Sequence, residues 1–181
     1  EDGIRDSSVT GVQMCALPIS RLLRQRGLAA RLVVVGPTDT DKADALPADL
    51  VSTATADGVV FAGRRDDMPE CYAAFDLFVT ASWREGFPRA AMEAAAMGLP
   101  TVATDIRGNR QVVVPGSTGL MVPVRDATSL ADACGSLVID ADERQQMGGA
   151  AVARASAEFG DRAVIDRTLA AYALLRRPRP A

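Results

Sequence analysis

Short runs of β-branched residues alternate with longer segments rich in alanine and leucine from residue 21 onward. The runs are apolar throughout, which is typical of strands buried on both faces. Strand and helix patterns that follow one another in this way predict repeated β-α units around a parallel sheet. We therefore expect an α/β protein in which helices flank a parallel sheet. The predicted strands cover residues 30–36, 59–63, 76–82, 101–105 and 118–124.

Helices are predicted between and after these strands. One of them covers residues 88–97, with Pro88 at its first helical position and Gly98 at its end. Asp126 or Thr128 is suited to cap the helix that follows the last strand. The arginine-rich faces of the last two helices are expected to be solvated. The remaining helical segments are residues 46–58, 68–75, 126–138, 140–159 and 161–177, with a single helical turn over 109–114 and, in residues 21–28, the end of a helix that Gly27 closes.

Three loops follow predicted strands and are suited to bind a ligand, because ligands of open parallel sheets bind outside the carboxyl ends of the strands. The first loop begins with Gly36 and the second with Gly63 and Arg64. The third loop runs from Ser82 to Phe87 and leads into the helix at Pro88. The free amides of that helix's first turn would point toward the strand ends, so this third loop predicts an anion site.

Two glutamates border this third loop and its helix. Glu85 lies on the loop, and Glu93 follows eight positions later among small apolar residues. That separation is a little over two helical turns, so both side chains can face one cleft. We expect Glu93 to be buried, and a buried carboxylate needs a hydrogen-bonding partner or a ligand. A carboxylate can accept hydrogen bonds from two adjacent hydroxyl groups of a sugar.

These positions also have simpler interpretations. From composition alone, a solvated glutamate in an alanine-rich helix is favoured for Glu93. Gly36 and Gly63 are commonly strand terminators, and Arg64 is commonly a surface charge. The chain contains neither GxGxxG nor GxxxxGK, so the usual dinucleotide and P-loop signatures are absent.

Composition narrows the classes of function. The chain has 181 residues, 48% of them hydrophobic, and a formal net charge of −3. This profile predicts a soluble globular domain without the basic tract that nucleic-acid binding needs. The absence of histidine excludes Ser-His and Cys-His catalysis. Cys15, Cys71 and Cys134 are too far apart to indicate a disulfide framework or a zinc site, which favours a reducing cytoplasm.

The two ends of the chain differ from the rest. Residues 1–20 resemble a translated sequencing-adapter read, so we expect a non-native leader there and a natural protein that is longer at its N-terminus. The opening acids and the lack of a continuous apolar core do not fit a signal peptide, and no apolar run approaches the roughly 20 residues of a membrane span. Residues 176–181 are expected to be a frayed tail.

The segment "EGFPRAAMEAAAMGLP" at residues 85–100 carries a family resemblance. With its flanking sequence it resembles the C-terminal, nucleotide-sugar-binding domain of the retaining GT-B glycosyltransferases of family 4, also called group 1 glycosyltransferases. The resemblance covers residues 21–175, and its most specific element is the pair of glutamates within the Gly-Phe-Pro and Ala-Met-Gly-Leu-Pro frame. It implies a Rossmann-like parallel sheet, the C-terminal half of a GT-B fold.

The resemblance implies roles for individual residues. Glu93 would accept hydrogen bonds from the ribose of the donor nucleotide, and Glu85 would approach the transferred sugar as the catalytic-site glutamate. The amides of Gly86, Phe87 and Arg89 would lie near the sugar and diphosphate, beside Pro88, which has no amide to donate. The strand ends at Gly36, Gly63 and Arg64 would border the donor, with Gly63 and Arg64 nearest the base.

The implied reaction transfers a sugar from a nucleoside diphosphate to an acceptor hydroxyl with retention, and it needs neither a metal nor a further cofactor. The leaving phosphate would take the acceptor proton, while helix amides and cations stabilise the diphosphate. The implied partners are the sugar nucleotide and an N-terminal acceptor domain that this chain lacks, so the fragment alone is expected to be inactive. Relatives of this kind build cell-surface polysaccharides and glycolipids, which allows peripheral membrane contact at the inner face through the missing half.

The chain departs from the family pattern in two places. The Arg and Lys that clamp the diphosphate would fall within residues 1–20 or before them, and the family's Gly-Gly-x-x-Glu is replaced by the segment from Arg107 to Gln111. Two other interpretations stay open: a non-catalytic nucleotide-binding domain on the same scaffold, and a GT-B nucleotide-sugar epimerase. The absence of histidine argues against the epimerase, because such enzymes depend on ionisable groups in the cleft.

Overall fold

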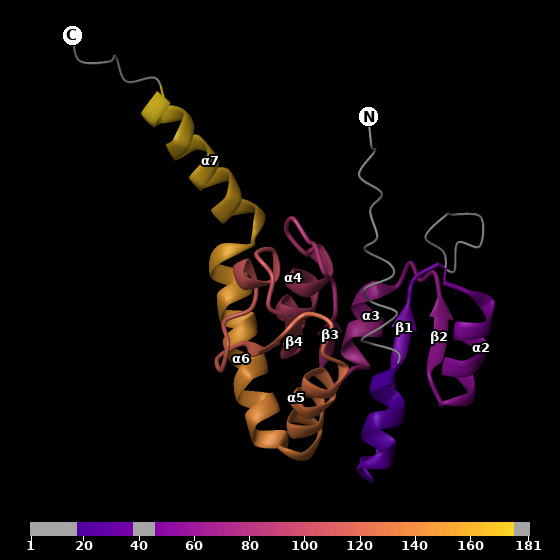
Figure 1. Ribbon diagram of the computed structural model, residues 1–181. Coiled ribbons are helices and arrows are strands. Elements are labelled where there is room, and N and C mark those ends of the chain that lie inside the picture. Colours follow the sequence, from indigo (N-terminus) through magenta and orange to yellow (C-terminus); the bar gives the residue numbers. More distant parts are fainter. Residues whose placement is uncertain (1–17, 38–45, 176–181) are drawn as a thin grey trace.

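The computed structural model describes residues 18–37 and 46–175. The predicted leader up to residue 17, Cys15 and the tail 176–181 lie outside the described residues. The described residues form five strands and seven helices, together with one short 3-10 helix. Figure 1 shows their arrangement in space. The strands are β1 (Val33–Val35), β2 (Val60–Gly63), β3 (Phe78–Thr80), β4 (Thr101–Thr104) and β5 (Gly119–Val122). The helices are 18–25, α2 (Ala48–Ala56), α3 (Met68–Ala73), α4 (Arg89–Ala96), α5 (Ala127–Ile139), α6 (Ala141–Glu158) and α7 (Asp161–Leu175), with η1 at Asn109–Gln111.

All strand pairs are parallel, which confirms the predicted α/β class. β3, β4 and β5 form one sheet in that order, and β1 pairs with β2 in a second set. Phe78 lies opposite Thr101, and Thr101 lies opposite Gly119, so the three strand starts are aligned. The sequence pattern predicts where strands lie, but the division into two hydrogen-bonded sets depends on pairing between distant residues, which periodicity does not encode.

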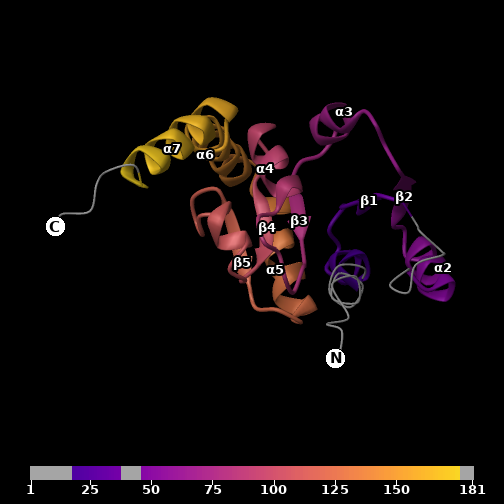
Figure 2. The ribbon, with the colours of Figure 1, turned by 90° about the horizontal axis from the view of Figure 1, so that it is seen from above.

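Helices cover both faces of the strands. Seen from above in Figure 2, α3, α4 and α6 lie on one side, and α5 with the helix over 18–25 lies on the other. β4 is buried at every position, and the core around it includes Val102, Leu130 and Leu137, each with 0% exposure. Asp126 caps α5 by accepting a hydrogen bond from the Ser129 amide at 2.9 Å, as one of the two predicted caps.

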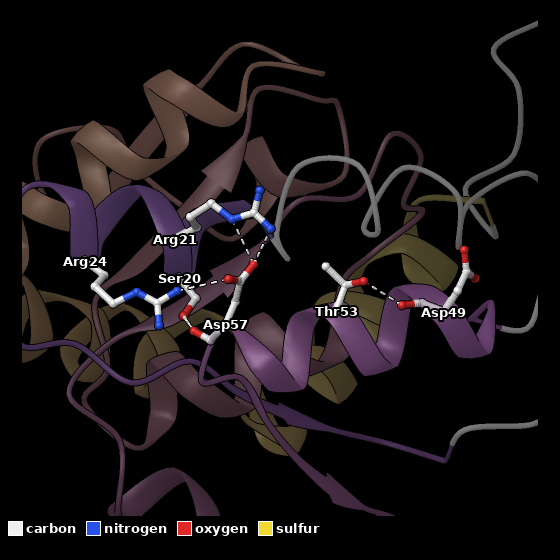
Figure 3. Close-up of polar contacts among 6 residues, drawn as sticks. All are labelled: Ser20, Arg21, Arg24, Asp49, Thr53 and Asp57. Atoms are coloured by element: carbon white, nitrogen blue, oxygen red, sulfur yellow. Dashed lines mark hydrogen bonds and ion pairs between the residues drawn. The ribbon is translucent and has the colours of Figure 1, made fainter.

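The helix over 18–25 is fastened to the end of α2 through Asp57 (Figure 3). Ser20 donates its hydroxyl to the Asp57 carbonyl at 2.9 Å, and Arg21 and Arg24 both donate to the Asp57 carboxylate. On its inner side Ile19 is only 2% exposed and belongs to the main core. Ile19 and Ser20 are therefore packed into the domain, and the predicted domain start at residue 21 falls inside this helix.

Asp57 gives the fold an expected dependence on pH. The hydrogen bond from Arg21 lowers the pKa of Asp57, and the charge of Arg24 adds to this effect. A carboxyl whose folded pKa is lowered stabilises the protein above its unfolded pKa of about 4, and this contribution is lost as the pH falls through the folded value. We expect Asp57→Asn to lower the melting temperature at pH 7. The melting temperature of the variant should also fall less than that of the wild type when the pH is lowered below about 4. Asp66→Asn is the matched control, because Asp66 is 91% exposed and lies 3.6 Å from Arg64; an equal effect of both variants would contradict the prediction.

α7 extends away from the sheets at the end of the described chain (Figure 1). None of its residues is buried, and it exposes a set of large apolar side chains. They include Ile165 at 55%, Leu169 at 59% and Tyr172 at 62%. The predicted solvation of its arginine-rich face is confirmed at Arg162, which is 96% exposed. Among the described helices, none combines the length and the apolar character that crossing a membrane requires.

Candidate functional site

Glu85 lies on the turn that leaves the carboxyl end of β3, as predicted. Its Oε1 accepts a hydrogen bond from the Ser82 hydroxyl at 2.8 Å, and Ser82 is 6% exposed. Glu85 itself is half-buried. A buried hydroxyl three residues before the carboxylate therefore orients one of its oxygens and leaves the other available to a ligand.

Buried polar side chains connect this turn to the loop after β4 by hydrogen bonds. Thr104 donates its hydroxyl to the Ser82 carbonyl, and Asn109 donates its side-chain amide to the Thr104 carbonyl at 2.8 Å. Thr104 is 1% exposed and Asn109 is 0% exposed. Buried polar groups stabilise a structure only when they are paired, so these bonds fix the loop after β4 against the end of β3. Sequence reasoning named Ser82 only as the start of the loop and missed the roles of Thr104 and Asn109; their only sequence signal is a polar residue at or near a strand end.

The segment from Arg107 to Gln111, which departs from the family pattern, lies against the Glu85 turn. A Cβ atom placed on Gly108 would stand 2.4 Å from the Glu85 carbonyl oxygen, so the two backbones touch at a distance that only glycine permits. The Gln111 side-chain amide donates to the Gly86 carbonyl at 3.3 Å. The loops after β3 and β4 are therefore in direct contact at the predicted site.

α4 begins directly after this turn. Pro88 is the N-cap residue of α4, so the helix begins at Arg89, one residue later than predicted. No side chain in the described part of the chain caps the helix, and its first turn contains no acidic residue. Among the described residues, the amides of Arg89, Ala90 and Ala91 have no hydrogen-bond acceptor. Free amides at a helix N-terminus attract an anion, so this end of α4 can bind a phosphate group.

Glu93 is not buried, which corrects the prediction from its alanine-rich surroundings. Its side chain is 47% exposed, and its Oε2 accepts a hydrogen bond from the Tyr72 hydroxyl at 3.1 Å. α4 buries only one face, formed by Ala91, Ala94 and Ala95. Because alanines occupy both faces of α4, the sequence pattern could not show which face carries Glu93. Burial, together with the hydrogen bond to Glu93, raises the pKa of Tyr72 to about 12, so this phenol stays a donor at neutral pH.

Gly36 and Gly63 meet at the carboxyl ends of β1 and β2. The Gly36 amide donates to the Gly63 carbonyl at 2.9 Å, and Gly63 has a positive φ of 66° that glycine adopts freely. Arg64 is 80% exposed and lies 3.6 Å from Asp66. Among the described residues, no hydrogen bond or ion pair joins these three positions to residues 85–93. The structure thus unites Glu85, Gly86, Phe87, Pro88 and Arg89 in one turn and leaves the predicted base-side residues as a separate group.

Known proteins are similar to this chain in both sequence and fold. A D-inositol 3-phosphate glycosyltransferase from Nocardia farcinica is 34% identical over 140 residues, which are 75% of this chain and 31% of that protein. The structure of a sucrose-phosphate synthase from Thermosynechococcus elongatus matches with a TM-score of 0.73 and 28% identity over 87% of this chain and 42% of that one. An Anabaena protein solved in complex with UDP-glucose shares the fold, with a TM-score of 0.64 and 22% identity over 94% of this chain and 56% of that one.

The chain spans about a third of the length of the curated relatives it matches, at 30% and 31% for two of them. The family described as "Glycosyl transferases group 1" matches residues 5–140, which is most of the chain. The predicted resemblance is confirmed at this level, together with the α/β fold. This chain belongs to the group 1 glycosyltransferases.

Proposed function

We propose that this chain is the donor-binding part of a retaining glycosyltransferase, with residues 21–175 forming the nucleotide-sugar-binding domain. One observation carries the proposal: a half-buried glutamate, oriented by Ser82, stands directly before a helix whose first amides are free. A sugar nucleotide presents hydroxyl groups next to a diphosphate. That pair of groups fits a carboxylate beside a helix N-terminus.

Each predicted residue has a part in this proposal. Glu85 accepts hydrogen bonds from the transferred sugar, and the amides of Gly86, Phe87 and Arg89 face the sugar and diphosphate. Glu93 accepts from the ribose, an arrangement supported by its 47% exposure, since Tyr72 holds only its Oε2 and leaves Oε1 accessible to a ligand. Gly36, Gly63 and Arg64 border the base side of the donor.

In the proposed reaction the bond between the sugar and the diphosphate breaks, a bond from the acceptor oxygen forms on the same face, and the leaving phosphate takes the acceptor proton. The first amides of α4 stabilise the charge that develops on the diphosphate. No metal and no further cofactor is assigned to this scheme.

We propose that an N-terminal acceptor domain completes the enzyme, and that the chain alone does not transfer sugar. Two observations support this partner. The chain spans about a third of the relatives' length, with 31% coverage for the Nocardia protein, and α7 carries exposed apolar side chains that suit a protein surface. The proposed setting is the cytoplasm, with peripheral contact at the inner membrane face through the acceptor half during synthesis of polysaccharide or glycolipid.

Calorimetric titration of the chain with UDP, GDP and ADP tests the proposal directly. We expect one of the three nucleoside diphosphates to bind, and the corresponding sugar nucleotide to bind more tightly. A chain that unfolds cooperatively, and is therefore folded, but binds none of them would contradict the donor-binding function.

The two glutamates are expected to differ in what they bind. Losing a hydrogen bond to a charged group costs about 1.5–3 kcal/mol, which corresponds to roughly a tenfold loss of affinity or more. Glu93→Gln should weaken nucleoside diphosphate and sugar nucleotide alike, whereas Glu85→Gln should weaken the sugar nucleotide only. Glu70→Gln is the control, because Glu70 is exposed on α3. Equal losses with both ligands for Glu85→Gln would show that its assignment to the sugar is wrong.

A further inference from the structure

Helix α6 reaches the turn of Glu85 through a chain of contacts that the proposed donor site does not use. Arg154 on α6 donates from Nη2 to the Gln111 carbonyl at 3.0 Å, and the Gln111 side chain donates in turn to the Gly86 carbonyl at 3.3 Å. Beyond the end of α6, the ring of Phe159 packs edge-on against Phe87, with 5.8 Å between ring centroids. Gly86 and Phe87, the two residues after Glu85, are therefore both linked to the C-terminal end of α6. Gly86 is linked through Gln111 and Arg154, and Phe87 is linked through the ring of Phe159.

Arg154 does not behave as a solvated arginine, which corrects the prediction for the arginine-rich face of this helix. Its side chain is 23% exposed, and its guanidinium lies 5.7 Å above the Phe159 ring. It also pairs with Glu158 at 3.1 Å, and its Nε is buried without a partner among the described residues. Removing a guanidinium from water is costly, so its contacts to Gln111 and Phe159 have to be well formed in return.

The two sides of the turn are held differently. Ser82, Thr104 and Asn109 anchor its β3 side through buried hydrogen bonds. Gly86 is exposed, and Phe87 is 44% exposed. On this outer side Gly86 accepts a hydrogen bond from the Gln111 side chain and Phe87 packs against the Phe159 ring, so these two contacts help to fix the position of Gly86 and Phe87.

We propose that Arg154, Gln111 and Phe159 are positioning residues, which hold Gly86 and Phe87 so that Glu85 meets the sugar of the donor. The proposal rests on the proposed donor-binding function. It assigns to helix α6 a role in the sugar-dependent part of binding and none in binding the nucleoside.

The first test compares each nucleoside diphosphate with its sugar nucleotide on the full chain, using UDP with UDP-glucose, GDP with GDP-mannose and ADP with ADP-glucose. The ratio of the two affinities is the sugar increment. Arg154→Met and Phe159→Leu should lower this increment at least fivefold and change nucleoside diphosphate affinity less than twofold. Gln111→Ala, which removes one longer hydrogen bond, should have a smaller effect in the same direction. Arg162→Met is the control, because Arg162 is 96% exposed on α7.

The second test needs no ligand. Trp83 is the only tryptophan of the chain and lies two residues before Glu85, so its fluorescence reports on the turn. Arg154→Met and Phe159→Leu should increase acrylamide quenching of Trp83, whereas Arg162→Met should not. Melting temperatures identify a variant that has unfolded. If Arg154→Met or Phe159→Leu is unfolded, the result for Gln111→Ala decides whether the positioning role holds, because Gln111 is exposed and its replacement leaves the core intact.

The outcomes separate the two proposals. Failure of the wild-type chain to bind any of these nucleoside diphosphates or sugar nucleotides would overturn the donor-binding function and with it the sugar-positioning role. Wild-type binding with an unchanged sugar increment in the variants would overturn the positioning role alone. Equal loss of affinity for the nucleoside diphosphate and its sugar nucleotide would mean a merely structural role, and unchanged Trp83 quenching in folded variants would also overturn the inference.

Discussion

Gly148→Ala is expected to lower the free energy of unfolding by about 3 kcal/mol, the upper part of the usual range for an overpacked site. A Cβ on Gly148 would stand 2.2 Å from the Gly98 carbonyl oxygen at the end of α4. The clash is with backbone, so no side-chain rotation relieves it, and α4 would have to move away from α6. This contact is where the helix that carries Glu93 packs on α6.

Gly149→Ala provides a matched control with the opposite sign. Nothing lies within 4 Å of a Cβ at Gly149, and the residue is inside the same helix. Alanine should therefore stabilise the chain by roughly 0.5–1 kcal/mol, because glycine loses more backbone entropy on folding. Urea unfolding of both variants at one pH measures the difference. Shifts of the same sign at both positions would contradict the packing described here.

Gly108→Ala is expected to have the largest effect on the proposed site. Its Cβ would lie 2.4 Å from the Glu85 carbonyl oxygen and 2.7 Å from the Glu85 Cβ. The two loops must separate by roughly 1 Å before this contact becomes an ordinary van der Waals distance. Glu85 would then lose its hydrogen bonds to the sugar, and because a hydrogen bond to a charged group contributes about 1.5–3 kcal/mol, we expect sugar-nucleotide affinity to fall at least tenfold.

The control for Gly108→Ala is Gly160→Ala, where the nearest atom to the added Cβ is 3.6 Å away, an ordinary contact. Calorimetric titration gives the affinity, and a melting curve at the same pH shows whether the variant is folded. A folded Gly108→Ala chain that keeps the wild-type affinity for the sugar nucleotide would show that Glu85 is not held by the loop after β4.

Much of the fold follows from local patterns. The β4 prediction over 101–105 differs from the observed strand by one residue, and the helix at Arg89–Ala96 begins one residue after its predicted start. Both segments lie next to a proline or glycine and have a clear apolar pattern, so the local sequence is sufficient to predict where they begin and end. The prediction over 30–36 covers more than the three residues of β1, because the length of a short strand depends on how far its partner extends.

The sequence by itself determined the β-α order, the turn with Glu85 before a helix N-terminus, and the family, because these depend on residues close together in the chain. Only the tertiary structure decided that Glu93 is exposed, that Gly108 and Gln111 touch the Glu85 turn, and that Arg154 reaches Gln111 across 43 positions. Those contacts join segments far apart in the sequence, and a periodic pattern describes which residues prefer burial but not which surfaces meet.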